Sequence, residues 1–309
     1  MASHFYRQHL NHATRFVLLA LCIAASPVQA ADIDPATILE ASGAEAKKQP
    51  DGVVRIAWSR DDVPVEVDGL RLPPAQGLGS WAAFAPMSNG AMVMGDTVVF
   101  EDEVDAAMDA AFKAGLEVSG LHNHFFFERP KVYFMHIGGH GEPTRLAAGI
   151  KAVWDAIKTV RKSRPEPATG LGGPVPVTGS IDADAISKAV GHRAEVNGGV
   201  AKITIGREGR MHGERVGASM GLTTWAAFSG SDQLATVDGD IIMTAEEVQP
   251  VLRALRQAKF HVVALHNHMI GEQPAFYFVH YWGKGPALEV ALGFRRVLDV
   301  QQAAPRTKS

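Results

Sequence analysis

The sequence predicts an α+β protein built from two tandem copies of one domain, each an antiparallel sheet with flanking helices. Residues 121–141 and 265–285 align at a constant offset of 144 without a gap, and eleven of these 21 positions are identical. The same offset matches 81–84 with 225–228, which both have the sequence WAAF. Because further segments match on either side, the repeat covers nearly the whole chain.

Each copy is expected to begin with a short helix, because Asp34 followed by Pro35, and Asp182 in the second copy, are typical of a helix N-terminus. Strands, a helix with apolar residues at helical spacing, a hairpin and a closing helix should follow. In the first copy these elements are expected at 53–58, 81–84, 91–100, 101–114, 118–124, 132–137 and 144–160. In the second copy the strands are expected at 200–205 and 225–228, and the helices at 245–258 and 286–300.

The first thirty residues have the pattern of a secretory signal peptide. Arg7 and Arg15 precede a short apolar run at 16–25, and small residues end the segment at Ala30. The run is too short to cross a bilayer, and no later stretch is long and apolar enough to do so. We therefore expect export to the periplasm or beyond the cell, with no transmembrane segment in the mature protein.

The composition excludes several classes of function. The only cysteine, Cys22, lies in the signal segment, and Leu21 is too large for a lipoprotein processing site, so cleavage after Ala30 is favoured over lipid anchoring. Without cysteine, the mature protein has neither disulfides nor thiolate ligands. It keeps 28 basic and 33 acidic side chains, and this mild acidity argues against nucleic acid as a partner.

These observations divide the chain into five parts. They are a signal peptide (1–30), a first repeat domain (31–162), a linker rich in proline and glycine (163–180), a second repeat domain (181–303) and a tail (304–309). Packing of one repeat against the other is expected.

Both copies keep three histidines and one glutamate in the pattern His-x-His-x3-Glu-x7-His, while their neighbours differ. These residues are His122, His124, Glu128 and His136 in the first copy and His266, His268, Glu272 and His280 in the second. Side chains two apart on a strand share a face. If residue 124 pairs with 132 across the hairpin, 122 faces 134, and His136 becomes a diagonal neighbour of His122.

This donor set predicts a divalent transition metal in each repeat: zinc, manganese, iron or copper. The glutamates, Glu128 and Glu272, are interpreted as a fourth ligand or as a general base beside the metal. Two alternatives remain open: the histidines form a hydrogen-bond network, or they line a small-molecule pocket with aromatic walls. Asp96 and Asp240 follow glycines and are interpreted as turn residues, with a place in the site as the alternative.

The spacing His-x-His-x3-Glu resembles the first metal motif of cupins over seven residues, without the strands that a cupin would place before it. A second resemblance covers nearly the whole mature chain. The segment LHNHMIGEQPAFYFVHYWGKG, the preceding Gly239-Asp240 strand and helix, and the first copy of each resemble the LppY/LpqO family of exported bacterial proteins. That resemblance implies export and this repeat architecture, and it assigns no catalytic residue.

The sequence thus predicts an exported tandem-repeat protein that binds a transition metal in each repeat and acts on a small molecule as a metal-dependent hydrolase or oxidoreductase. The alternative is a non-catalytic binding or structural protein of the cell envelope.

Overall fold

The computed structural model describes residues 32–177 and 179–305. The expected signal peptide and the last four residues of the expected tail lie outside this part of the chain. Among the described residues, no helix is both long and apolar enough to cross a membrane.

The two repeats fold into the same order of elements, except that β8 of the first repeat has no counterpart strand in the second. The first contains α1 (Pro35–Ser42), β1 (Ala46–Lys48), β2 (Val54–Ser59), β3 (Glu66–Val67), β4 (Leu70–Arg71), the 3-10 turn η1 (Pro74–Gln76), β5 (Gly79–Met87), β6 (Gly90–Phe100), α2 (Val104–Lys113), β7 (Glu117–His122), β8 (Glu128–Arg129), β9 (Val132–Gly141) and α3 (Pro143–Ser163). The second contains α4 (Ala183–Val190), β10 (Ala194–Asn197), β11 (Val200–Gly206), β12 (Gly209–Met211), β13 (Glu214–Val216), η2 (Ala218–Met220), β14 (Thr223–Gly230), β15 (Ala235–Met243), α5 (Ala245–Gln257), β16 (His261–His266), β17 (Tyr277–Gly285) and α6 (Ala287–Ala303).

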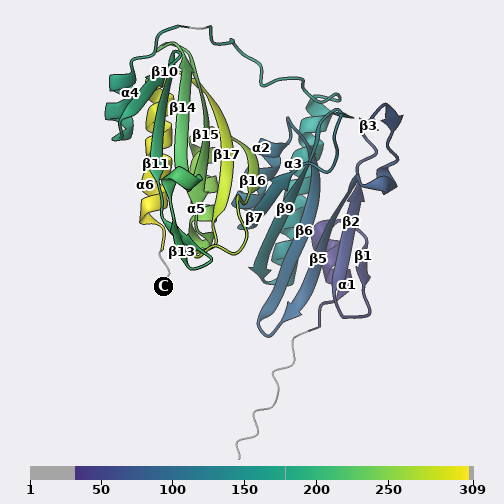
Figure 1. The fold of residues 1–309 in the computed structure, drawn as a ribbon. Coiled ribbons are helices and arrows are strands. Elements are labelled where there is room, and N and C mark those ends of the chain that lie inside the picture. Colours follow the sequence, from purple (N-terminus) through teal and green to yellow (C-terminus); the bar gives the residue numbers. More distant parts are fainter. Residues whose placement is uncertain (1–31, 178, 306–309) are drawn as a thin grey trace, which may run out of the picture.

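The predicted α+β class is confirmed, and the two sheets join into one. The twelve strands lie in the order β1-β2-β5-β6-β9-β7-β16-β17-β15-β14-β11-β10, so each repeat contributes six neighbouring strands. Figure 1 shows the first repeat in purple to teal beside the second in green to yellow, with β7 and β16 between them. The predicted helix caps also form: Asp34 accepts a hydrogen bond from Ala36 N, and Asp182 accepts one from Ala185 N.

A pseudo-twofold axis passes between the repeats. On β7 and β16, Leu121 pairs antiparallel with Leu265, which is its own equivalent at the offset of 144. Equivalent residues face each other only at a twofold axis. The repeats therefore meet in an isologous contact.

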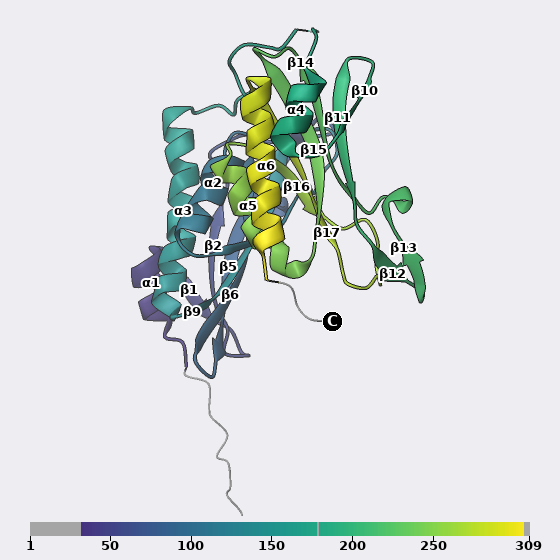
Figure 2. The ribbon, with the colours of Figure 1, turned by 90° about the vertical axis from the view of Figure 1, so that its left-hand side faces the viewer.

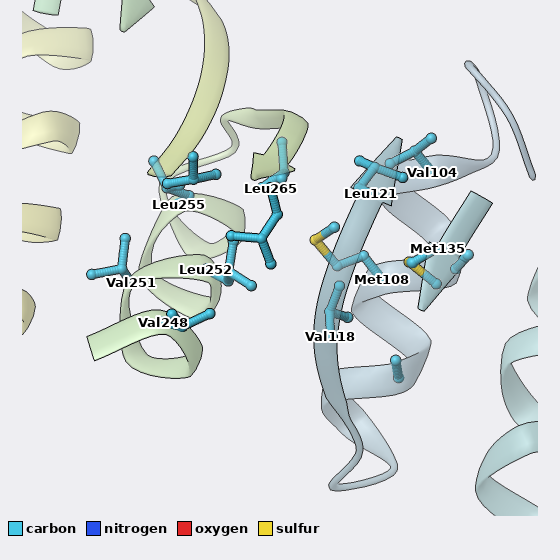
Figure 3. Packing of buried hydrophobic residues seen from close by; sticks show 14 of the residues in the cluster. Val104, Met108, Val118, Leu121, Met135, Val248, Val251, Leu252, Leu255 and Leu265 are labelled. Atoms are coloured by element: carbon cyan, nitrogen blue, oxygen red, sulfur yellow. The ribbon is translucent and has the colours of Figure 1, made fainter. Parts of the chain in front are cut away.

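The six α-helices of the described segments pack on one face of the sheet (Figure 2), where their apolar residues and the inward residues of the strands form a core shared by both repeats. At the junction, Met108 and Leu121 of the first repeat lie opposite Leu252 and Leu265 of the second (Figure 3). Burial of such apolar side chains contributes about 1.5–3 kcal/mol each. We call the opposite side the helix-free face.

Two small apolar clusters cover the outer parts of the helix-free face. In the first repeat the segment around β3 and β4 packs Val65 and Leu78 on Phe100 and Phe134. In the second repeat Val216, Leu222 and Phe276 pack on Ile242 and Phe278. The strip near the pseudo-twofold axis carries the imidazoles of His122 and His266 instead, because each follows a leucine of the helix-side core.

Polar contacts also join the repeats on the helix side. The Gln249 amide donates to Val118 O and accepts from Val118 N, at 2.7 and 3.1 Å. His261 Nδ1 lies 2.6 Å from Asp105 Oδ2. His261 therefore belongs to the junction, because β16 begins beside α2.

Candidate functional site

The three histidines of the first repeat meet on the helix-free face. His122 ends β7, and its neighbour Leu121 points into the helix-side core, so the imidazole points the other way. The predicted register is confirmed, since His122 pairs with Phe134 and His136 with Gly120. His122 and His136 have ring centroids 5.0 Å apart, and their Nε2 atoms approach to 2.9 Å.

The third histidine reaches this place by a different route from the one predicted. The strand expected over 118–124 ends at His122, and His124 lies in the loop beyond it. In that loop Asn123 Nδ2 donates to Phe125 O at 2.8 Å, which satisfies local backbone as the sequence suggests. The His124 ring then stacks on Phe134 with centroids 3.3 Å apart and lies 5.2 Å from His122.

The second repeat reproduces the arrangement. His266 pairs with Phe278 and His280 with Ala264. The ring centroid of His266 lies 4.9 Å from that of His280 and 5.1 Å from that of His268. His268 stacks on Phe278 at 3.5 Å, as His124 does on Phe134. Two loops of different sequence therefore place three imidazoles in the same way.

An aspartate joins each group, and the turn interpretation of these aspartates is wrong. Asp96 lies inside β6 directly opposite His136, and Asp240 lies inside β15 directly opposite His280. His268 Nε2 is 3.3 Å from Asp240 Oδ2, and His280 Nε2 is 4.0 Å from the same atom. The sequence signal was the pair Gly95-Asp96 and Gly239-Asp240, which the two repeats also share at the offset of 144.

In the second repeat these side chains come close to the spacing that a metal ion needs. One ligand atom from each of Asp240, His266 and His268 lies within 4.8 Å of the others. Three such donors about 2.0–2.2 Å from a common ion are compatible with that spacing. In the described part of the first repeat, no three ligand atoms meet this criterion, and His122 and His136 contact each other instead.

The structure does not bring the two predicted glutamates into these groups. Glu272 is buried, and its Oε1 accepts a hydrogen bond from Phe276 N at 2.7 Å, so it stabilises the loop that precedes β17. Glu128 is also buried and lies on β8, whose partner is β3. Each glutamate follows its second histidine by four residues, and in the second repeat the loop turns the carboxylate toward its own backbone.

Several polar atoms of the site are buried without a hydrogen-bond partner. Among the described residues they include Oδ1 of Asp96, Oδ1 of Asp240 and Nδ1 of His266. Asp240 is only 2% exposed and Asp96 8%. Leaving a buried polar atom unpaired costs about 1–3 kcal/mol. Atoms of this kind are expected where a further ligand completes the bonding.

Burial controls the protonation of the group. It raises the pKa of Asp240 above its ordinary value, although His280 and His266 act in the opposite direction. Burial likewise lowers the pKa of His266 and His268, and the other imidazoles of the group add to this lowering. In the first repeat burial lowers the pKa of His124, against the attraction of Asp96. Neutral imidazoles, the form that binds metals, are thereby favoured.

An aromatic ring and a cation flank each group. Trp81 pairs with Asp96, and the guanidinium of Arg55 lies 4.6 Å from the Trp81 ring centroid. In the second repeat Trp225 pairs with Asp240, and Lys202 Nζ lies 4.4 Å from the Trp225 ring centroid. The repeats therefore keep a cation, a tryptophan, an aspartate and three histidines in the same order across the sheet.

Comparisons with solved structures give weak similarities. A trimeric bacterial microcompartment shell protein, PduB, is 11% identical with a TM-score of 0.22, covering 82% of this chain and 89% of that one. The double-ringed trimeric shell protein MSM0271 from the RMM microcompartment is 16% identical with a TM-score of 0.18, covering 73% and 83%. Likenesses at this level carry no conclusion about fold or function. No curated protein matches the chain.

A family model matches both repeats, over residues 36–156 and 184–300, which together make up most of the chain. These two segments contain all six histidines and both aspartates described above. The chain therefore belongs to the family described as Domain of Unknown Function (DUF1259), with one copy of the domain in each repeat.

Proposed function

We propose that this is an exported tandem-repeat protein that binds one divalent transition metal ion in each repeat through three histidines and one aspartate. The ligands would be Asp96, His122, His124 and His136 in the first repeat and Asp240, His266, His268 and His280 in the second. The observation that carries the proposal is the convergence of Asp240, His266 and His268 within 4.8 Å, with Asp240 Oδ1 buried and unpaired.

A hydrogen-bond network explains the same residues less well. A network that stabilised the hairpins would pair its buried atoms, whereas Asp240 Oδ1 and His266 Nδ1 have no partner in the part of the chain that the structure describes. The His122 and His136 Nε2 atoms, 2.9 Å apart, form a hydrogen bond if one ring donates and the other accepts, so this pair fits either explanation. The unpaired atoms of the second repeat are what favour a metal.

The donor set suits zinc, manganese, iron or copper, and it includes no sulfur. When bound, such an ion would supply Lewis-acid or redox chemistry. His124 and His268 are solvent-exposed, so a small molecule could approach each group from the helix-free face. Glu128 and Glu272 would act by positioning the loops that carry His124 and His268. Hydrolase or oxidoreductase activity would require a coordination position that these ligands leave open.

The test is elemental analysis of the untagged mature protein, purified without chelators. We expect about two equivalents of one metal per chain. Asp240→Asn should lose one equivalent because it removes the carboxylate charge while keeping the side-chain shape. Glu272→Gln should keep both, and so should His212→Asn, a matched control at an exposed position with φ 52° that asparagine tolerates. Absence of metal after reconstitution, or equal metal content in every variant, would overturn the proposal.

A cavity at the repeat junction favours a second candidate function, the binding of a small apolar ligand. The cavity has a volume of about 370 Å³. It is lined by Tyr133, Trp282, Val263 and linker residues 168–171, and also by the polar side chains Glu101, Asp102, Asp105 and His261. Such a mainly apolar pocket with aromatic walls suits a flat aromatic molecule. Binding of N-phenyl-1-naphthylamine that is abolished in a cavity-filling Val263→Trp variant would support this function; equal binding by both proteins would exclude the cavity as the site.

A further inference from the structure

The two histidine groups lie side by side on one face of one sheet. Leu121 and Leu265 pair at the pseudo-twofold axis and both belong to the helix-side core. The next residues, His122 and His266, therefore point to the helix-free face, one on each side of the axis. This arrangement depends on the direct pairing of β7 with β16, which makes the two repeats halves of one surface.

Strand spacing gives the distance between the groups. His136 lies on β9 and His280 on β17, and the order β9-β7-β16-β17 places two strands between them. At about 4.8 Å per strand, their backbones are about 14 Å apart, measured across the strands. Each proposed ion is shared between β6 and β7 or between β15 and β16, so it lies over the strand between them, β9 or β17, and the two ions are also about 14 Å apart.

Small residues occupy the sheet between the two groups. Gly120 is the partner of His136 on β7, and Ala264 is the partner of His280 on β16. A Cβ at Gly120 would meet His136 Cδ2 at 3.2 Å, so the glycine lets the imidazole lie close to the strand. Neither residue has a side chain large enough to form a wall between the groups.

The charges around this strip are arranged to attract an anion once metals are bound. A divalent ion with one aspartate and three neutral histidines keeps a net positive charge. The exposed Arg55 and Lys202 add positive charge on the outer sides of the two groups. Opposite charges raise the local concentration of a ligand of the complementary sign.

We propose that the two metal sites act together as a receptor for one small molecule with an anionic group at each end, a linear dicarboxylate being the simplest member of the class. This inference rests on the proposed function. Each end would coordinate one ion at about 2.0–2.2 Å. Two such bonds subtracted from an ion separation of about 14 Å leave about 10 Å between the anionic oxygens.

Chelation makes the proposal measurable. Once one end is bound, the other end is held near the second ion at an effective concentration in the millimolar range or above. A matching dicarboxylate should therefore bind at least about tenfold more tightly than a monocarboxylate, and the gain should fall for chains that are too short or too long.

The experiment is calorimetric titration of the zinc-loaded full chain, after its metal content has been measured, with succinate, adipate, pimelate, suberate and sebacate, and with butyrate as the monocarboxylate. We expect one dicarboxylate per chain, an affinity maximum within the series, and two butyrates per chain. The single-site variants Asp96→Asn and Asp240→Asn should each keep one metal and lose the gain over butyrate. Either variant suffices if the other fails to fold.

The outcomes separate this inference from the function beneath it. Two bound metals with two dicarboxylates per chain, no dependence on chain length, or no binding would overturn the shared receptor and leave metal binding intact. A dicarboxylate gain that persists in both single-site variants would also overturn it. Failure to bind metal at all would overturn the proposed function and the shared receptor with it.

Discussion

Replacement of Glu103 by glutamine should be among the most destabilising conservative changes in this protein. The Arg60 and Glu103 side chains are both fully buried. Arg60 Nη1 donates to Glu103 Oε2 at 2.7 Å and Nη2 donates to Oε1 at 2.9 Å. Glu103 Oε2 also accepts from Phe100 N at 2.9 Å, and Arg161 Nε lies 2.6 Å from Oε1. Glu103→Gln keeps the shape and removes the charge that two arginines share.

Breaking a buried ion pair by removing one partner costs about 3–5 kcal/mol, because the other charge stays buried without compensation. Asp62 remains 2.9 Å from Arg60 Nε and is partly exposed, so it compensates in part. We therefore expect Glu103→Gln to lower the free energy of unfolding by about 3 kcal/mol, near the lower end of that range. The second repeat supplies a matched control, the pair Arg207–Glu247, in which the Arg207 side chain is 27% exposed.

Water reaches Arg207, so Glu247→Gln should cost less, about 1–2 kcal/mol. The measurement is urea denaturation of wild type and both variants, followed by far-ultraviolet circular dichroism, with comparison of the free energies of unfolding. Equal costs in the two repeats, or a cost below about 1 kcal/mol for Glu103→Gln, would refute the reasoning from burial. Metal content should stay unchanged in both variants, because neither residue lies in the histidine groups.

Burial alone would raise the pKa of Glu247, but hydrogen bonds from Arg207 and other partners outweigh it and hold that pKa below the ordinary value. The ionised Glu247 therefore stabilises the folded protein above the unfolded pKa of about 4.3. This stabilisation is lost as the pH falls through the folded pKa. The melting temperature of wild type should thus fall more steeply below about pH 4 than that of Glu247→Gln, and parallel curves would contradict this. Gln249→Ala should lower the free energy of unfolding, measured by urea denaturation, by about 1–3 kcal/mol, because Val118 N and O both lose their partner. An unchanged urea midpoint would show that water replaces the amide. Phe127 has φ 60° and an exposed side chain, and the other repeat has glycine at the equivalent position. Phe127→Asn should therefore raise the free energy of unfolding by up to about 1 kcal/mol. A lower free energy of unfolding would show that the aromatic ring stabilises the loop.

Local signals predict much of the fold. The caps at Asp34 and Asp182 form because a side-chain oxygen and the backbone it serves lie within three residues of each other. The hairpin register, with His122 opposite Phe134, follows from the alternation of strand faces and a short connection. The internal repeat strengthens these predictions, because a feature that both copies keep is rarely there by chance.

The aspartate that completes each histidine group is harder to predict from the sequence. Asp96 precedes its partner His136 by forty residues, and only the pairing of β6 with β9 brings them together. The glutamates were favoured because they lie close in sequence to the histidines, yet Glu272 bonds to Phe276 N within its own loop. Proximity in sequence does not set the direction in which a loop turns a side chain.

The sequence by itself determined the repeated α+β unit, the six histidines and the face of each strand, because all three depend on local periodicity and on comparison of the two copies. Only the tertiary structure decided which edge of each sheet meets the other. The edge strands β7 and β16 carry unpaired backbone groups that any strand can satisfy, so their sequences do not specify a partner. The packing of Leu121 and Leu265 between the helices selects this partner, and it places both histidine groups on one surface.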